Sequence, residues 1–344
     1  MSQGFFLRST EDQISSLTEF AHDLLAECGL KNYSIECINY EFNATFAVLA
    51  EDSKKYALRI NINSTRTLSN TNAEIAWLNF LQNRPGIQVG HPLRFKGLMT
   101  TADDSSEYVT QKLHRDSGRT LTAVLITWID GEELDDEPTD QQIFAMGKAM
   151  ANLHEVSSDF RLPAGCELPK FDDLFWGTED CLFSSSSALP PAEALILQQA
   201  FNKINNTVAA MYQVAEANGE GVQIIHADMH GGNVLWSENQ NQSETKLAVI
   251  DFDDSGIGLL VQDISIALYY FDTPEQDALF LKGYESIRAL PKYSEVEMDS
   301  LLLHRRLMLL NYLYETTNQE HRAMIPDYLA ETMRRAEKYL ALSQ

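Results

Sequence analysis

The feature that most constrains the fold of this chain is a change in hydrophobic pattern near residue 130. Before it lie three short strand-like runs separated by polar turns (34–40, 45–50 and 56–62). Short apolar runs bounded by polar turns are typical of strands. After Gly131, apolar residues recur at helical spacing, as from Ile143 to Leu153. A strand-rich first part and a helical second part predict an α+β fold of two lobes, with a hinge near Trp128.

Three helix starts are predicted from local sequence. Thr10 with Gln13, and Thr139 with Gln142, fit the capping box, in which a Ser or Thr and the residue three positions on satisfy each other's backbone amides. A further helix is predicted from about residue 72 to 81 by apolar residues on one face.

The charge balance narrows the classes of partner. The 344 residues include 26 Lys and Arg against 50 Asp and Glu, a formal net charge of −24. This charge repels nucleic acid and anionic membrane surfaces and favours cationic partners, although a generally solvated acidic surface explains it too. The four cysteines are scattered, the first ten residues lack a secretory core, and charged residues interrupt the most apolar late stretch. We therefore expect a cytoplasmic protein that binds neither nucleic acid nor membrane.

The segment from Val222 to Trp236 carries the strongest chemical signal. Asp228 and Asn233 lie in a loop between two short apolar strands, and the next apolar strand ends in Asp251. Phosphoryl transfer needs a carboxylate that orients and deprotonates the accepting hydroxyl, and oxygen ligands for the ions that offset the triphosphate charge. The spacing of Asp228 and Asn233 is that of the catalytic Asp and metal-binding Asn in the protein-kinase loop.

A zinc site is the alternative interpretation of the same loop. His226, Asp228 and His230 alternate, so a strand would point all three to one side. A catalytic zinc site normally needs three well-placed ligands and an open position, and binuclear hydrolase motifs are richer in histidine. We therefore favour His226 as a residue that braces the loop backbone and His230 as a polar loop residue.

A family resemblance follows from these motifs. His226-Ala-Asp-Met-His-Gly-Gly-Asn233, followed by Val249-Ile-Asp-Phe-Asp-Asp254, resembles the aminoglycoside phosphotransferase and choline kinase superfamily, nearest to its type II homoserine kinases and bacterial stress-response kinases. The resemblance spans about residues 33–313, and only 226–263 is distinctive. It implies a two-lobed, protein-kinase-like α+β fold. A small antiparallel-sheet lobe over 1–126 would bind nucleotide, and a larger, mainly helical lobe over 127–344 would carry catalysis and the acceptor.

The resemblance also implies residue roles in an ATP-dependent kinase. Asp228 would be the catalytic base, and Asn233 and Asp251 would hold Mg2+. Arg59, on the third strand of the small lobe, would contact phosphate, with an arginine fork where many members have lysine. The backbone at Trp128 and Ile129 would hydrogen-bond adenine.

Four further residues are assigned supporting roles. Asn43 would contact the nucleotide from a turn that contains no glycine, and Asp253 would assist at the metal or orient the loop. Glu74 would pair with Arg59, although Thr71 and Glu74 also fit a capping box. Asp263 would brace the catalytic loop together with His226, a role compatible with a cap on the helix over 264–270.

The acceptor is predicted less directly. A kinase for the hydroxyl of a small, amine-bearing molecule fits the net charge and the acidic residues after Asp263 (Asp272, Glu275 and Asp277). A protein Ser/Thr kinase of the stress-response type is the first alternative, and a catalytically silent nucleotide-binding protein is the second. The simultaneous presence of Asp228, Asn233 and Asp251 disfavours the silent protein.

Overall fold

The computed structural model describes residues 2–95, 108–134, 137–173, 175–219, 221–238, 246–316 and 318–342. The chain divides into two compact units, each made of three segments. Unit 1 comprises Met1–Glu132, Arg161–Glu167 and Ser237–Asp253, and unit 2 comprises Glu133–Phe160, Leu168–Trp236 and Asp254–Gln344.

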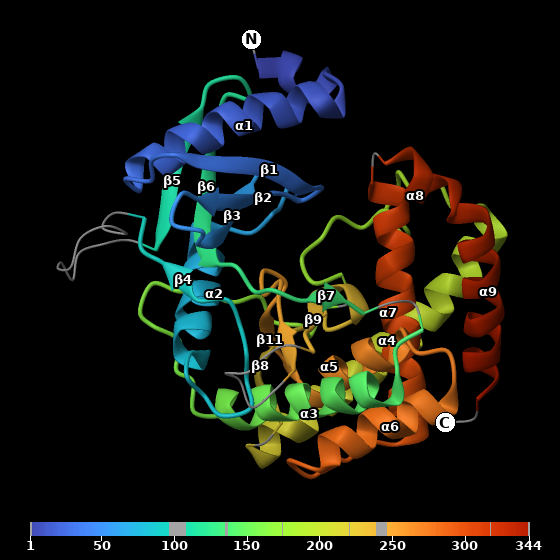
Figure 1. Cartoon of the computed structure of the whole chain (residues 1–344). Helices are drawn as coiled ribbons and strands as arrows, with labels where there is room; N and C mark the ends of the chain where they lie inside the picture. Colours follow the sequence, from blue (N-terminus) through green and yellow to red (C-terminus); the bar gives the residue numbers. More distant parts are fainter. Residues whose placement is uncertain are drawn as a thin grey trace. The chain divides into compact units, whose positions relative to one another are not determined.

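Unit 1 is built on an antiparallel sheet (Figure 1). Among the described residues, six strands pair in the order β1-β2-β3-β6-β4, and β5 also pairs with β6. These strands are β1 (Tyr33–Tyr40), β2 (Asn43–Ala50), β3 (Lys55–Asn61), β4 (Pro92–Leu93), β5 (Val109–His114) and β6 (Arg119–Thr127). The short strand β10 (Leu247–Val249) also belongs to this unit.

The two faces of the sheet differ in chemistry. Helix α1 (Thr10–Glu27) packs on one face, and its buried side chains share a core with alternate residues of β2 and β3, such as Phe46, Leu58 and Ile60. A short 3-10 helix, η1 (Ser2–Leu7), adds Phe5 to that core. Successive strand residues point to opposite faces, so Arg59 lies on the face away from α1.

Two of the three predicted helix starts were wrong, and for the same reason. Helix α1 is capped by Ser9, whose hydroxyl accepts from the Asp12 amide. Helix α2 (Leu68–Leu81) is capped by Thr67 with Asn70, one turn before the predicted start. In each case an earlier hydroxyl residue also fits a cap, and the helix extends back to it. The capping box at the start of α3 (Asp140–Ser157) is confirmed.

Unit 2 is mainly helical. Besides α3 it contains α4 (Pro191–Asn218), α5 (Leu260–Tyr269), α6 (Pro274–Glu285), α7 (Glu295–Glu315), α8 (Gln319–Ala323) and α9 (Ile325–Ala341). Its short strands are β8 (Val222–Ile225), which pairs antiparallel with β11 (Gly256–Leu259), and β9 (Val234–Trp236). The strand β7 (Glu132–Glu133) lies where the two units join in the sequence. No helix in the described ranges is long and apolar enough to span a bilayer.

Helices α3 and α6 cross at unusually close range (Figure 1). A Cβ added at Gly147 of α3 would come within 1.9 Å of the Phe280 carbonyl oxygen of α6. Reciprocally, a Cβ at Gly283 of α6 would come within 2.1 Å of the Phe144 carbonyl oxygen of α3. Only glycine permits this approach, because any side chain would overlap the facing backbone.

Candidate active site

The loop after β8 is held by one buried carboxylate. Asp263, fully buried in the first turn of α5, accepts from the His226 amide at 3.1 Å and from the Ala227 amide at 2.8 Å. Helix α5 begins at Leu260, so the alternative interpretation of Asp263 as an N-cap was wrong. Ala227 has a φ of 67°, a left-handed conformation that is uncommon outside glycine. Asp263 therefore holds a strained turn immediately before Asp228.

A buried chain of polar groups supports Asp263. The Asp263 carboxylate lies 2.9 Å from His154 Nε2, and His154 Nδ1 lies 2.8 Å from the Tyr284 hydroxyl. Burial by itself would raise the pKa of Asp263, but the bond to His154, the His226 ring and the Ala227 amide together hold that pKa below its usual value. Asp263 thus remains an anion suited to accepting backbone amides.

Asp228 lies among donors. Its Oδ1 accepts from Arg305 Nη2 of α7, and its Oδ2 accepts from Asn233 Nδ2 at 2.9 Å and lies 3.5 Å from His230 Nε2. Burial opposes ionisation of Asp228, but Arg305, His230 and His226 lower its pKa to about 2. Asp228 is therefore a carboxylate at neutral pH.

Asn233 is oriented by the same loop. Both of its described side-chain hydrogen bonds use Nδ2, which donates to the Asp228 carboxylate and to the Asp228 carbonyl oxygen at 2.8 Å. The short helix η2 (Gly231–Asn233) starts at His230, whose Nδ1 accepts from the Gly232 amide at 3.1 Å. This use of the amide nitrogen leaves Asn233 Oδ1 as the atom suited to a hard cation.

The histidines of the proposed zinc trio have other roles. His226 Nδ1 accepts from the Asp228 amide at 3.3 Å, and His230 caps η2. Within the part of the chain that the structure describes, no group of three or more His, Cys, Asp or Glu side chains is placed to hold a metal ion.

Arg305 and Tyr270 are site residues that we did not predict. Arg305 is 8% exposed, and its Nη2 donates to the Tyr270 hydroxyl at 2.7 Å as well as to Asp228. The Tyr270 ring lies 4.8 Å from the His230 ring. An arginine within the apolar part of α7 is a sequence signal for a buried acidic partner, because arginine is almost never buried unpaired. The signal does not say which acid, and Asp228 is 77 positions away.

In unit 1, Arg59 is enclosed by carboxylates. Its Nη2 donates to Glu74 Oε2 on α2, and its Nη1 lies 3.9 Å from Asp251 Oδ1. The Arg59 side chain is 13% exposed and that of Glu74 is 4% exposed. The alternative interpretation of Glu74 as part of a capping box with Thr71 was wrong, because α2 starts six residues before Glu74. Burial opposes the charge of Arg59, but Glu74, Asp253 and Asp251 raise its pKa, so the guanidinium stays protonated.

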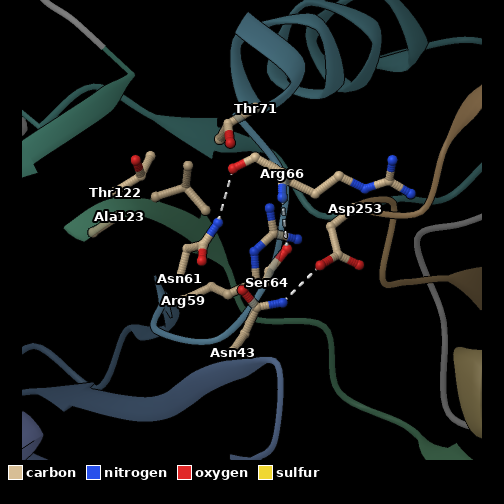
Figure 2. Close-up of a pocket in the computed structure, with 10 residues that line it drawn as sticks. Asn43, Arg59, Asn61, Ser64, Arg66, Thr71, Thr122, Ala123 and Asp253 are labelled. Carbon is tan, nitrogen blue, oxygen red and sulfur yellow. Dashed lines mark hydrogen bonds between the residues drawn. The ribbon is translucent and has the colours of Figure 1, made fainter. Parts of the chain in front are cut away.

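Polar side chains surround Arg59 in a small pocket (Figure 2). Its lining residues are Asn43, Arg59, Asn61, Ser64, Arg66, Thr71, Thr122, Ala123, Val124 and Asp253. Asn43 Nδ2 donates to Asp253 Oδ2 at 2.6 Å, and Asn61 Nδ2 donates to the Arg66 carbonyl oxygen at 3.2 Å (Figure 2). Burial would raise the pKa of Asp253, but Arg59 and hydrogen bonding lower it, so Asp253 is an anion.

A larger cavity of about 320 Å³ opens elsewhere in unit 1. It is lined by Ser34, Ile35, Glu36, Ala47, Val48, Leu49, Lys55 and Trp128. The Trp128 amide donates to the Lys55 carbonyl oxygen at 3.2 Å, so this amide extends the sheet, and Ile129 follows it. Lys55 and Arg59 lie on the same face of β3, about 13 Å apart at strand spacing. The cavity and the Arg59 pocket therefore lie toward opposite ends of one strand.

Asp251 follows β10, which is anchored by the bond from the Val249 amide to the Gln88 carbonyl oxygen at 2.9 Å. Like Ala227, Asp251 is left-handed, with a φ of 59°, and its side chain is 45% exposed. Strained, partly exposed acidic residues of this kind concentrate at functional sites. Its carboxylate oxygens are ligands of the type that magnesium prefers.

Comparison with known proteins identifies the family. Residues 40–297 match the sequence model of the phosphotransferase enzyme family. The chain belongs to this family. Amicoumacin kinase of Bacillus subtilis (strain 168) is 24% identical over 320 residues, which cover 87% of this chain and 83% of that relative. The superfamily predicted from the motifs is confirmed, and the chain is an enzyme of the kinase type.

Two solved structures share the fold of this phosphotransferase. A microcompartment-associated aminopropanol kinase matches with a TM-score of 0.74 and 23% identity, covering 94% of this chain and 98% of that one. Amicoumacin kinase hAmiN, in complex with AMP-PNP, Ca2+ and Ami, matches with a TM-score of 0.71 and 17% identity, covering 95% and 96%. The predicted two-lobed α+β fold is confirmed.

Most of the predicted site residues of the phosphotransferase fall into two sets. Unit 1 brings together Asn43, Arg59, Glu74, Asp251 and Asp253. Unit 2 brings together His226, Asp228, Asn233 and Asp263. Trp128 lines the larger cavity of unit 1 rather than the Arg59 pocket.

Proposed function

We propose that this phosphotransferase moves the γ-phosphoryl group of ATP to a hydroxyl of a small, amine-bearing acceptor, with Asp228 as the base. The observation that carries the proposal is the environment of Asp228, a buried carboxylate kept ionised by Arg305 and aligned by Asn233. In phosphoryl transfer the base acts chiefly by orienting the acceptor hydroxyl and taking its proton.

The face of the sheet away from α1 supports nucleotide binding. We assign the 320 Å³ cavity that Trp128 lines to the base of ATP, with Ile129 next to it in the chain, and Arg59 to the phosphates. The spacing along β3 suits a ligand with a flat ring at one end and anionic groups at the other. Glu74 would hold the Arg59 fork in place, and Asn43 would approach the phosphates from the start of β2.

The oxygen donors present fit magnesium. Asn233 Oδ1 and the Asp251 carboxylate are the proposed ligands, and Asp253, held by Asn43, would assist or orient Asp251. When bound, Mg2+ supplies positive charge against the β- and γ-phosphate oxygens. His226 and Asp263 keep the loop in the conformation that presents Asn233.

A cationic acceptor fits the charge of the protein. The formal net charge of −24 would concentrate cations near the surface. Asp272 and Glu275 are exposed near the start of α6, and Asp277 follows them. Burial raises the pKa of Asp277, and its Oδ1 has no hydrogen-bond partner among the described residues. An amino alcohol carries both the cation and the hydroxyl, and one similar structure is an aminopropanol kinase.

The test is an ADP-release assay with purified protein, Mg-ATP and a panel of acceptors. The most informative pair of acceptors is 1-amino-2-propanol and 1,2-propanediol, in which a hydroxyl takes the place of the amine. We expect turnover on amine-bearing alcohols, with a KM that rises with salt because surface charge is screened within about 8–10 Å. Rapid phosphate incorporation into protein, with no turnover on any amine-bearing alcohol, would favour the protein-kinase alternative instead.

A further inference from the structure

Arg305 also borders a small cavity inside unit 2. The cavity has a volume of about 10 Å³ and is lined by Trp176, Gln262, Ser265, Ile266, Leu301, His304, Arg305 and Met308. This volume is close to the smallest that holds one water molecule. The lining contains no carboxylate and is contributed by the segment before α4 together with α5 and α7.

Two of the residues that line this cavity each carry an N–H donor without a partner. Trp176 Nε1 and Arg305 Nε are buried and have no hydrogen-bond partner among the described residues. The opposite end of the same guanidinium is engaged, because Nη2 donates to Asp228 and to Tyr270. Buried donors are nearly always satisfied, so a pair of them on one water-sized cavity indicates a shared acceptor.

The backbone of Trp176 is held in an unusual conformation. Its φ is 52°, a genuine outlier for a bulky aromatic residue. The turn is fixed by the bond from the Trp176 amide to the Asp173 carbonyl oxygen at 3.3 Å. The indole stacks on Phe171 at 4.0 Å and meets the His304 ring edge-on at 5.8 Å. Such strain persists where the surroundings over-determine it, typically near functional groups.

We propose that Trp176 is a positioning residue for Asp228, and that Trp176 Nε1 and Arg305 Nε donate to one buried water in this cavity. Ser265 Oγ, which donates to the Gln262 carbonyl oxygen at 2.7 Å, is an acceptor for a hydrogen of that water. The bridge fixes the rotation of the guanidinium, so that Nη2 stays on Asp228 while Tyr270 accepts its second hydrogen bond. The inference rests on the proposed function, in which Asp228 is the base.

Indole NMR tests the bridge without catalysis. The chain has four tryptophans, so 15N-labelled protein gives four indole signals, and Trp176→Phe identifies the one from Trp176. We expect a nuclear Overhauser effect from water to this indole proton, and we expect Arg305→Lys to abolish it and shift the signal. Arg306→Lys is the matched control, because Arg306 bonds Thr332, Tyr269 and Tyr328 instead. A wild-type indole with no contact to water, or one indifferent to Arg305→Lys, overturns the proposal.

Steady-state kinetics test the positioning role. Trp176→Phe keeps an aromatic ring on Phe171 but removes the N–H, and we expect kcat to fall about tenfold with the KM for ATP unchanged. Phe183→Leu trims the neighbouring aromatic cluster away from the cavity and should leave kcat near wild type. Unchanged kcat in Trp176→Phe overturns the positioning role. Failure of the proposed function is recognised separately, by near-normal turnover of Asp228→Asn.

Discussion

Two buried arginine–carboxylate pairs, one in each unit, have opposite surroundings. Arg59 pairs with Glu74 and has two further carboxylates near it, so the group in the minority is the cation. Asp228 pairs with Arg305 and is surrounded by donors, so the group in the minority is the anion. The same kind of ion pair therefore suits two different tasks. The carboxylates around Arg59 exceed its charge and can also bind a metal cation, whereas Arg305 keeps the Asp228 carboxylate ionised.

Neither pair is best explained by stability. Replacing a buried ion pair by apolar residues is often neutral or stabilising, because both charges are taken out of water. Glu74 Oε1 is buried with no hydrogen-bond partner among the described residues, which adds to that cost in the Arg59 pair. Retention of both pairs is expected where each charge has a task in binding or chemistry.

The largest effect is expected from substitution of Asp228, the carboxylate that lies among donors. Asp228→Asn removes the base while keeping shape, and we expect kcat to fall about 10²–10⁴-fold with ATP affinity retained. Initial rates and nucleotide titration on the same protein measure the two quantities. Near-normal turnover would show that Asp228 is not the base. The difference between the two arginine–carboxylate pairs would then have no catalytic explanation.

The next effect concerns the partner of that anion. In the folded enzyme the pKa of Asp228 is about 2, lowered against burial chiefly by Arg305. Without Arg305, only His230 and His226 offset burial, so the pKa of Asp228 rises by about 1–3 units and the base is protonated at higher pH. We expect the acid limb of kcat/KM to move upward in Arg305→Gln. Arg306→Gln is the control, and an unmoved limb in Arg305→Gln would contradict our account of the pair.

In unit 1 the question is whether the carboxylates in excess around Arg59 bind Mg2+. At an Mg-ATP concentration 100 times the dissociation constant, the free energy of unfolding of the wild-type protein should rise by about 2.7 kcal/mol. We expect Asp251→Ala to lose the magnesium-dependent part of this gain, measured by thermal melting with ATP in the presence and absence of Mg2+. An identical melting shift in Asp251→Ala would remove Asp251 from the metal site.

The smallest effect is the coupling within the Arg59 pair. Arg59→Ala should raise the KM for ATP and lower kcat, and Glu74→Gln should do so more mildly. Residues in one ion pair are non-additive, so a double-mutant cycle in kcat/KM should give a coupling of about 0.5–3 kcal/mol. If the two effects simply add, Glu74 does not act through Arg59.

The same two pairs show how far sequence alone could lead. Arg59 and Glu74 are 15 positions apart, on a strand and the helix that follows it, so strand alternation and family motifs suffice to relate them. Arg305 and Asp228 are 77 positions apart, and only packing decides which acid a buried arginine meets. Trp176 was unpredictable for the same reason, since neither its left-handed backbone nor its cavity has a local signature.

Local ambiguity explains the remaining errors. Thr67 and Thr71 lie one helical turn apart and both fit a cap, so the start of α2 depends on where the preceding chain leaves the sheet. In sequence Asp263 fits both a cap and a brace, and the cap is excluded because β11, paired with β8, leads directly into α5 at Leu260. The loop with Asp228 and Asn233 carries the strongest signal in the sequence, because its residues are nearly consecutive, and the roles of Asp228 and Asn233 stay predictions.

The close crossing of α3 and α6 has a genetic consequence. Every missense mutation of a glycine codon adds at least one carbon, and at Gly147 or Gly283 that carbon overlaps a facing carbonyl oxygen. Relief would push α6 outward and carry Tyr284 away from His154, at a cost of about 1–3 kcal/mol or more. No amino-acid substitution at Gly147 or Gly283 is therefore expected to be neutral. A library that seeks new acceptors should keep both glycines fixed, because substitutions there are selected against for loss of stability.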